Sequence, residues 1–146
     1  MGKYKYSKGV SLIEVLVAVI ILAFGLLGLA GLQSVSLRNN NSAMMRTQAT
    51  YLAQDIVDRM RINKTAAIDD MSYEQPMATL KPTVAANSPL DVVDRNTWLT
   101  AIENILPSGD GEIDCVDATD VCVVTIQWND IRDGNTMQQF VTSTQL

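Results

Sequence analysis

The sequence predicts an α+β fold in which one long amino-terminal helix packs on a small antiparallel β-meander. No proline precedes Pro76 in the 146-residue chain, so a single helix can run from about Val10 to Arg61. The last third of the chain instead carries β-branched stretches separated by turn-forming residues, which is typical of short antiparallel strands. The length suits one domain with one extended element.

The composition favours a non-enzymatic role. The chain has a formal net charge of −5, whereas nucleic-acid binding requires a basic surface. It has no histidine, which is the commonest general base and metal ligand, and no glycine-rich phosphate loop. We therefore expect no catalysis, no cofactor, no metal and no nucleic-acid partner.

Residues 15–32 form an uninterrupted stretch of apolar or glycine residues. A membrane-spanning helix needs about 20 residues, at ~1.5 Å each, to cross a hydrocarbon core of ~30 Å. Three lysines, Lys3, Lys5 and Lys8, precede this stretch, and the next basic residue is Arg38. Because positive charge favours the cytoplasmic side, we expect a single-pass protein whose carboxyl-terminal part is exported.

A single carboxylate, Glu14, interrupts the apolar segment near its start. A charged group at mid-membrane costs roughly 2.5–3.5 kcal/mol on insertion scales, and the core of a secretory signal peptide has no use for one. Small residues in LAGLQSVS (29–36) still leave signal-peptide cleavage as an alternative. Cleavage after Gly9 would instead expose the amine of Val10. Glu14, one helical turn later, could then pair with this amine or with that of a neighbouring subunit and set the register between helices.

The residues around Gly9 resemble the class III signal of type IV prepilins. A lysine-containing leader ends in Gly9, and then follow an apolar residue, the sequence SLIEV (11–15) and the long apolar stretch. The resemblance implies that prepilin peptidase cuts between Gly9 and Val10 and methylates the new amine of Val10. It also implies that Glu14 is the carboxylate that sets subunit register.

Residues 9–64 resemble the minor pilins of the PilV type, also called type IV pilus modification proteins. The similarity lies in LLGLAGLQ (26–33) and LRNNNSAMMRTQATYLAQDIVDRMRINK (37–64), and it weakens after Lys64. It implies a type IV pilin-like fold. The protein would be held in the bacterial inner membrane with its head in the periplasm and then enter a pilus fibre at the cell surface.

The same resemblance implies a function and partners. The function would be to initiate or assemble the type IV pilus, and so to support pilus biogenesis, twitching motility and adhesion. The partners would be other minor pilins, the major pilin, prepilin peptidase, the inner-membrane assembly platform and a tip adhesin. Two alternatives stay open: a minor pseudopilin of a type II secretion system, and a membrane-anchored periplasmic binding or sensor domain with an uncleaved amino terminus.

These observations divide the chain into four parts. Residues 1–9 are the predicted leader, residues 10–33 the transmembrane and assembly helix, residues 34–64 its amphipathic continuation, and residues 65–146 the globular head. Within the head, residues 65–93 hold three of the four prolines. We expect them to form a variable surface loop with at most a short helix, where subunit-specific contacts are made.

The two halves of the predicted helix differ in pattern. In the lower half, apolar residues recur every three or four positions and predict a stripe that packs on the head: Met45, Ala49, Leu52, Ile56 and Met60. In the upper half, Gly25, Gly28 and Gly31 each cost roughly 1 kcal/mol relative to alanine. Either they allow close helix contacts in the membrane, or they mark a stretch that loosens when the subunit enters a fibre.

The head is predicted to contain one helix and three strands. Asp94 or Asn96 would cap a helix that starts near Thr97 and whose apolar face includes Trp98. Residues 111–116 and 121–128 are predicted strands joined by the turn DATD (117–120). Residues 136–144 form the closing strand after a second turn at Asp133-Gly134, with Met137 and Phe140 as its inward anchors. Trp98 and Trp128 are expected in the core.

Pairing the two strands places Cys115 opposite Cys122 across the hairpin. In an exported domain we expect a disulfide there, which would contribute about 2–3 kcal/mol on the chain-entropy model, in preference to free thiols or a metal site. Five carboxylates lie near this hairpin: Asp110, Glu112, Asp114, Asp117 and Asp120. A calcium site is the weaker interpretation, because the spacing is not that of an EF-hand and strand alternation sends some of these side chains to opposite faces.

Overall fold

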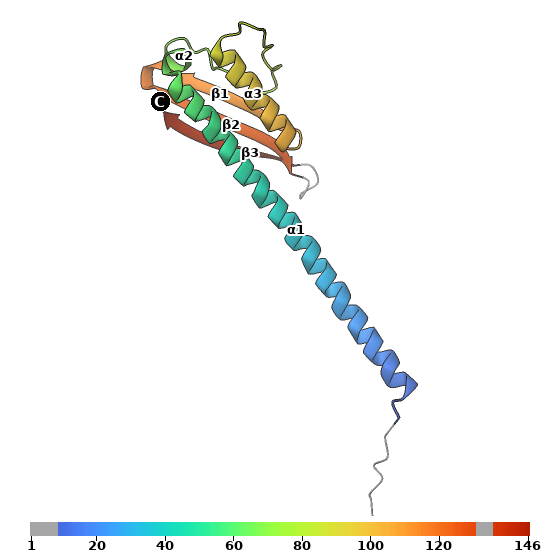
Figure 1. Ribbon diagram of the computed structural model, residues 1–146. Helices are drawn as coiled ribbons and strands as arrows, with labels where there is room; N and C mark the ends of the chain where they lie inside the picture. The colour runs from blue at the N-terminus through green and yellow to red at the C-terminus, as the bar shows by residue number, and fades with distance from the viewer. Residues whose placement is uncertain (1–8, 131–135) are drawn as a thin grey trace, which may run out of the picture. The chain divides into compact units, whose positions relative to one another are not determined.

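The computed structural model describes residues 9–130 and 136–146. Its elements follow one another along the chain in the order α1 (Leu12–Ile62), α2 (Lys64–Ile68), α3 (Leu90–Ile105), β1 (Asp110–Val116), the 3-10 turn η1 (Asp117–Thr119), β2 (Val121–Asp130) and β3 (Thr136–Gln145) (Figure 1). The chain divides into two compact units, Met1–Asn39 and Asn40–Leu146. The long amino-terminal helix and the small antiparallel sheet confirm the predicted α+β architecture.

The described part of the first unit consists of the residues that lead into α1 and the upper part of that helix. All of its described residues, 9–39, are exposed, including the entire apolar stretch. By length and composition, α1 is the helix of this structure that could cross a membrane, with a mean hydropathy of 2.9 in its most apolar window. The unit therefore carries an apolar surface that the chain itself does not cover.

The second unit has two layers. Its sheet has the strand order β1-β2-β3, and both neighbouring pairs are antiparallel. The buried apolar side chains of the sheet, such as Ile113, Val124 and Ile126, belong to one face, and the lower part of α1 and helix α3 pack on that face (Figure 1). The largest fully buried side chains come from both layers and from the loop between α2 and α3: Trp98, Trp128, Tyr73, Ile56, Met60 and Ile68.

The apolar stripe of the lower part of α1 is buried as predicted. Met45, Ala49, Leu52, Ile56 and Met60 all belong to the core. In addition, Trp98 of α3 donates a hydrogen bond from its indole Nε1 to the backbone oxygen of Leu52, at 2.9 Å. The two helices are thus joined by a polar contact as well as by apolar packing, and both tryptophans are core residues as expected.

Helix α3 starts earlier than predicted. It begins at Leu90, directly after Pro89, and not near Thr97. Pro89 has an extended ψ of 157° and cannot donate a backbone hydrogen bond, which suits a residue that precedes a helix. Asp94 and Asn96 therefore lie within α3 and do not cap it. The side chain of Asp94 is engaged in a tertiary contact instead, which is described below.

The predicted surface loop, residues 65–93, is more ordered than expected at its two ends and in its middle. Helix α2 occupies its start and the first turn of α3 its end. Between them, Gln75 is 3% exposed and pairs with Ile113 of β1 through two backbone hydrogen bonds of 3.0 and 2.9 Å. This bridge covers part of the outer edge of β1. The loop thus supplies sheet-edge protection that the sequence pattern did not indicate.

The β-hairpin register is the predicted one, with Cys115 opposite Cys122 and Val116 opposite Val121. The prediction for β3 was partly wrong. Phe140 packs against the core, whereas Met137 is 50% exposed. Residues three apart on a strand point to opposite faces, so the two could not both be inward anchors. The second turn, at Asp133-Gly134, lies outside the described residues.

Substituting Gly111 with alanine should destabilise the head by about 1–3 kcal/mol, because the core has no room for one more methyl group there. A Cβ at this position would overlap Cη2 of Trp98, and it would lie 2.7 Å from Cζ3 of that ring and 2.8 Å from Cδ1 of Ile102. Chemical unfolding followed by tryptophan fluorescence measures the loss, with Gln139→Ala on exposed β3 as the control variant.

A double-mutant cycle separates this clash from a general backbone effect. If Gly111→Ala is combined with Trp98→Phe, the smaller ring should recover part of the loss, giving a coupling energy of about 1 kcal/mol. Additive losses in the double variant would contradict the steric explanation.

Candidate functional site

The predicted processing position lies immediately before α1. Gly9 and Val10 precede the helix, and the Val10 side chain is 69% exposed. The backbone oxygen of Ser11 accepts hydrogen bonds from the N–H groups of Glu14 and Val15, at 3.0 and 3.3 Å, and so starts the helix. The leader lysines lie outside the described residues. The junction that a peptidase would need to reach is accessible in this structure.

Glu14 of α1 lines the same surface as Val10, which lies two residues before the helix. Val10, Glu14, Ala18 and Leu22 follow one another at intervals of one helical turn and line the same shallow apolar surface. No ion pair of the described residues involves Glu14, and no other charged residue occurs between it and Arg38. The structure therefore places this carboxylate alone on an uncovered apolar surface, one turn from the residue that cleavage would convert into a cation.

The three glycines of the upper half lie within the continuous helix α1. A Cβ added at Gly25, Gly28 or Gly31 would meet no atom within 4 Å. Packing inside this chain therefore gives no reason for glycine at these positions. The two interpretations from the sequence, contact with other helices and local loosening, both place that reason outside the isolated subunit.

A buried polar cluster joins α1, α3 and the loop between α2 and α3. Asp94 of α3, which is 5% exposed, accepts a hydrogen bond of 2.6 Å from the hydroxyl of Tyr73 and one of 3.0 Å from Nη1 of Arg59. Arg59 also donates from Nε to Asp55, one turn earlier on α1, at 3.0 Å. Sequence reasoning missed this cluster, because it assigned the Asp94 side chain to a helix cap.

The cluster changes the protonation behaviour of two of its members. Burial, followed by the hydrogen bond to Asp94, raises the pKa of the Tyr73 hydroxyl to about 12. Burial lowers the pKa of Arg59, but the hydrogen bonds to Asp94 and Asp55 outweigh it and raise the pKa overall. Both effects extend to higher pH the range in which the Tyr73 phenol stays neutral and the Arg59 guanidinium stays charged, because both groups have a raised pKa.

A second set of contacts fixes the turn of the cysteine hairpin. Cys115 and Cys122 are joined by a disulfide with an S–S distance of 2.04 Å, and both are buried. At the tip, Asp120 adopts a left-handed backbone conformation with φ of 53°. Lys64, at the start of α2, donates to the Asp120 carboxylate at 3.0 Å and to the backbone oxygen of Leu146 at 2.6 Å.

The carboxylates near the hairpin do not gather into one site. Asp110, Glu112 and Asp114 share the outer face of β1, so the expectation that alternation separates them was wrong for these three. Asp110 accepts hydrogen bonds from the backbone N–H groups of Gly111 and Ala78, and Asp120 is paired with Lys64. No cluster of three metal-binding side chains occurs among the described residues.

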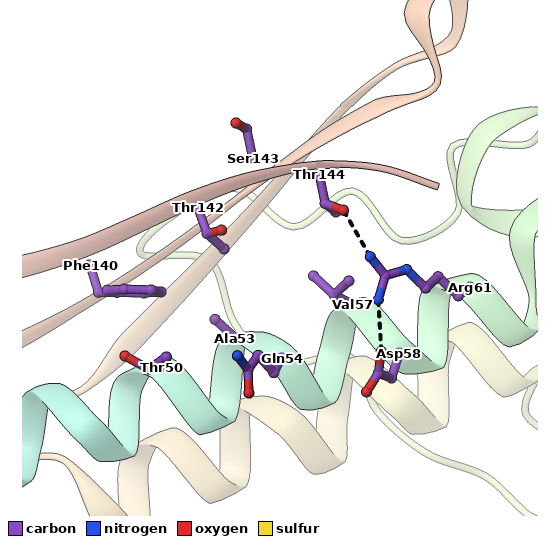
Figure 2. Close-up of a pocket in the computed structure, with 10 residues that line it drawn as sticks. All are labelled: Thr50, Ala53, Gln54, Val57, Asp58, Arg61, Phe140, Thr142, Ser143 and Thr144. Carbon is purple, nitrogen blue, oxygen red and sulfur yellow. Dashed lines mark hydrogen bonds and ion pairs between the residues drawn. The ribbon is translucent and has the colours of Figure 1, made fainter.

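A groove that the sequence did not reveal runs between the lower part of α1 and the edge strand β3, with a volume of ≈ 390 Å³ (Figure 2). Its walls combine small apolar and hydroxyl or amide side chains: Thr50, Ala53, Gln54 and Val57 from α1, and Phe140, Thr142 and Thr144 from β3. Arg61 closes one end, where its guanidinium donates to the Thr144 hydroxyl at 3.1 Å and to Asp58 at 3.0 Å.

We expect the stability of the head to fall as the pH rises from about 10 to about 12. The Tyr73 pKa is about 12 in the folded head and about 10 when unfolded. Because folding favours the neutral phenol, its contribution is complete below pH 10 and is lost as the pH passes through the folded pKa. The loss is about 2–3 kcal/mol, measured by urea unfolding at several pH values.

Tyr73→Phe is the control for this pH dependence. It should lower stability at neutral pH by about 1–2 kcal/mol, since Asp94 loses a hydrogen-bond donor, and it should flatten the decline above pH 10. An unchanged alkaline decline in this variant would show that other groups cause it.

Residues 4–30 match the family described as "Prokaryotic N-terminal methylation motif". Searches of curated proteins and of solved structures gave no match. The matched residues include the predicted cleavage junction, Glu14 and most of the apolar stretch of α1. This motif is a class III prepilin signal, and it indicates a type IV pilin or a pseudopilin, which are structural subunits. Together with the apolar helix, it fits a membrane-anchored pilin that prepilin peptidase processes.

Proposed function

We propose that this chain is a minor pilin of the PilV type, which enters the type IV pilus and helps to initiate or assemble it. The observation that carries this proposal is that one chain contains both an uncovered apolar helix and a head with its own core. The helix bears one lone carboxylate one turn after the predicted cleavage junction. No described residue of the chain covers this part of the helix, so its surface requires lipid first and other subunits later.

In this proposal, prepilin peptidase removes residues 1–9 and methylates the amine of Val10. The exposed junction and the match to the methylation motif support this step. Residues 10–33 anchor the subunit in the inner membrane, residues 34–64 continue the helix, and residues 65–146 complete a periplasmic head. Before assembly, lipid covers the apolar surface of the helix. In the fibre, the helices of neighbouring subunits cover it.

Glu14 would set the register of that packing. A carboxylate surrounded by apolar side chains is costly unless a positive group compensates it. The amine of a neighbouring Val10 is such a group, and pairing is possible only when the helices are staggered correctly. Val10 and Glu14 line one surface, so a neighbour packed on that surface meets both. The charge therefore selects one stagger among the many that apolar packing alone would allow.

The head would select which subunits lie beside it and contribute to pilus biogenesis, twitching motility and adhesion. Its partners would be the major pilin, other minor pilins, the inner-membrane assembly platform and a tip adhesin. The similarity of residues 9–64 to PilV-type proteins favours the pilus over the alternative, a minor pseudopilin of a type II secretion system. Leader, helix and head architecture would be shared by both.

Replacing Glu14 by glutamine tests the register mechanism. We expect normal cleavage, because the junction is unchanged, but a loss of incorporation into sheared fibres of roughly 30-fold or more, which corresponds to about 2 kcal/mol or more of lost pairing. Immunoblots of fibre and membrane fractions measure the ratio. Asp70→Asn, a matched carboxylate-to-amide change on the exposed surface of the head, should behave as the unchanged protein.

Two further results would decide between the alternatives. The intact mass of the protein from cells with active prepilin peptidase should be that of a chain without residues 1–9, and retention of those residues would overturn the proposal in favour of an uncleaved anchor.

In a deletion strain, pili should disappear and return when retraction is disabled. Normal pili with failed secretion of folded exoproteins would establish the pseudopilin instead.

A further inference from the structure

Strand β3 forms an open edge of the sheet. It follows β2 in the strand order, and no described residue pairs with its other side. Alternate backbone N–H and C=O groups of an edge strand point away from the sheet and require hydrogen-bond partners. The edge of β1, in contrast, is bridged by Gln75. One edge of the sheet is therefore partly covered by the chain itself, whereas the other edge is open.

The sequence of β3 carries none of the devices by which proteins usually protect an open edge. Thr136–Gln145 has no charged residue, proline or glycine. Its pairing with β2 is continuous from Thr136 opposite Asp130 to Gln145 opposite Val121, so no bulge twists the edge away. Ten uncharged residues in unbroken register form an edge that is able to receive another strand.

The groove described above lies beside this edge and has the direction of a strand. Arg46 of α1 reaches Gln138 at 3.0 Å, and Arg61 reaches Thr144 at 3.1 Å. The lower part of α1 thus follows β3 in the same direction along its length. Figure 2 shows the side chains of Thr142 and Thr144 directed towards α1 and that of Ser143 directed away. An added strand would continue the sheet, and every second side chain of that strand would cover this groove.

The charges around the groove indicate what kind of strand fits. In a chain whose net charge is −5, the two α1 side chains that cross to β3, at Arg46 and Arg61, are both cationic. The wall between them is uncharged, apart from Asp58 at the Arg61 end, which Arg61 already pairs. A complementary segment is therefore uncharged over its middle, with small apolar or hydroxyl side chains facing the groove, and carries a carboxylate near the end that meets Arg46.

We propose that the open edge of β3 and the adjacent groove bind an extended segment of a different polypeptide, which adds to the sheet as a fourth strand. Backbone hydrogen bonds to β3 provide the affinity, and the groove with its flanking arginines provides the selection. The choice of a different polypeptide over a second copy rests on the proposed function. Two β3 edges that paired antiparallel, as the strands within this sheet do, would turn the lower parts of their α1 helices in opposite directions, whereas subunits of one fibre share one direction.

Site-specific photocrosslinking in cells that express the full chain tests this proposal. The photoreactive residue p-benzoylphenylalanine is placed singly at Phe140, Thr142 and Thr144, which face the groove, and mass spectrometry identifies the crosslinked residue of the partner. Along a strand, moving the probe from 140 to 144 should move the partner residue by about four positions. Along a docked helix, the same ~13 Å would correspond to about nine positions.

A pair of lysine variants supplies the matched control. Thr142→Lys places a charge in the groove, where an added strand would bury it, and should reduce crosslinking from Thr144 at least tenfold. Ser143→Lys makes the same change one residue away on the outer face, which stays in water, and should reduce it less than twofold. The head of either variant should keep the thermal stability of the unchanged protein, since both side chains are solvent-accessible in the free subunit.

The proposal would be overturned if the groove positions gave no crosslink, or if the only crosslink were to a second copy of this chain. It would also be overturned if the crosslinked partner residue did not move with the probe, or moved by the nine or so positions expected for a helix. Equal loss in both lysine variants would also contradict it. The proposed function fails separately, through an uncleaved leader or absence from sheared fibres. If the crosslinked partner residue advances by four positions but the protein is never found in sheared fibres, the strand-addition site is supported and the pilin role is rejected.

Discussion

The head depends on burial of one stripe of α1 by the sheet. A sheet of three strands has too little surface to form a core with α3 alone, and the lower part of α1 contributes core side chains from Met45 to Met60. The constraint works in both directions. The stripe would be an exposed apolar band without the sheet, and the inward face of the sheet would have no cover over β2 and β3 without the helix. The upper half of the same helix is left uncovered. One helix thus combines a face that the head buries with a surface that its own chain leaves exposed.

This division explains how polar groups are distributed in the head. Where α1, α3 and the loop containing Tyr73 meet, the interface contains a carboxylate that is satisfied from two sides by Arg59 and by the tyrosine hydroxyl. The remaining polar contact between the helices, from Trp98 to the backbone of Leu52, leaves the helical hydrogen-bond pattern intact. Such contacts fix the position of α3 along α1, which apolar packing alone would allow to slide. The position of α3 in turn determines that of β1, because Gly111 lies against the Trp98 ring.

Features carried by local patterns were predictable from the sequence. The stripe of α1 repeats at helical spacing, and the turn of the hairpin lies in the sequence between Cys115 and Cys122. The residues of both features were therefore predicted correctly. Features that depend on contacts between distant segments were not. Asp94 has the chemistry of a helix cap, but in the fold it accepts hydrogen bonds from Tyr73 and from Arg59, which lies 35 residues earlier. The bridge from Gln75 to Ile113 and the groove along β3 likewise arise from tertiary pairing. The uncharged sequence of β3 was a visible signal of an open edge, but its significance depends on knowing which strand is outermost.

The parallel course of α1 and β3 has a mechanical consequence. A force that pulls on the lower part of α1 along its axis loads its contacts with β3 in shear, since the contacts from Arg46 to Arg61 are loaded together and not one after another. Shear geometries resist sudden loading better than peeling geometries made of the same contacts. The disulfide at the far end of the sheet removes one route by which the strands could separate under such a load. A head built in this way can bear a load along the lower part of α1 while its small core stays folded.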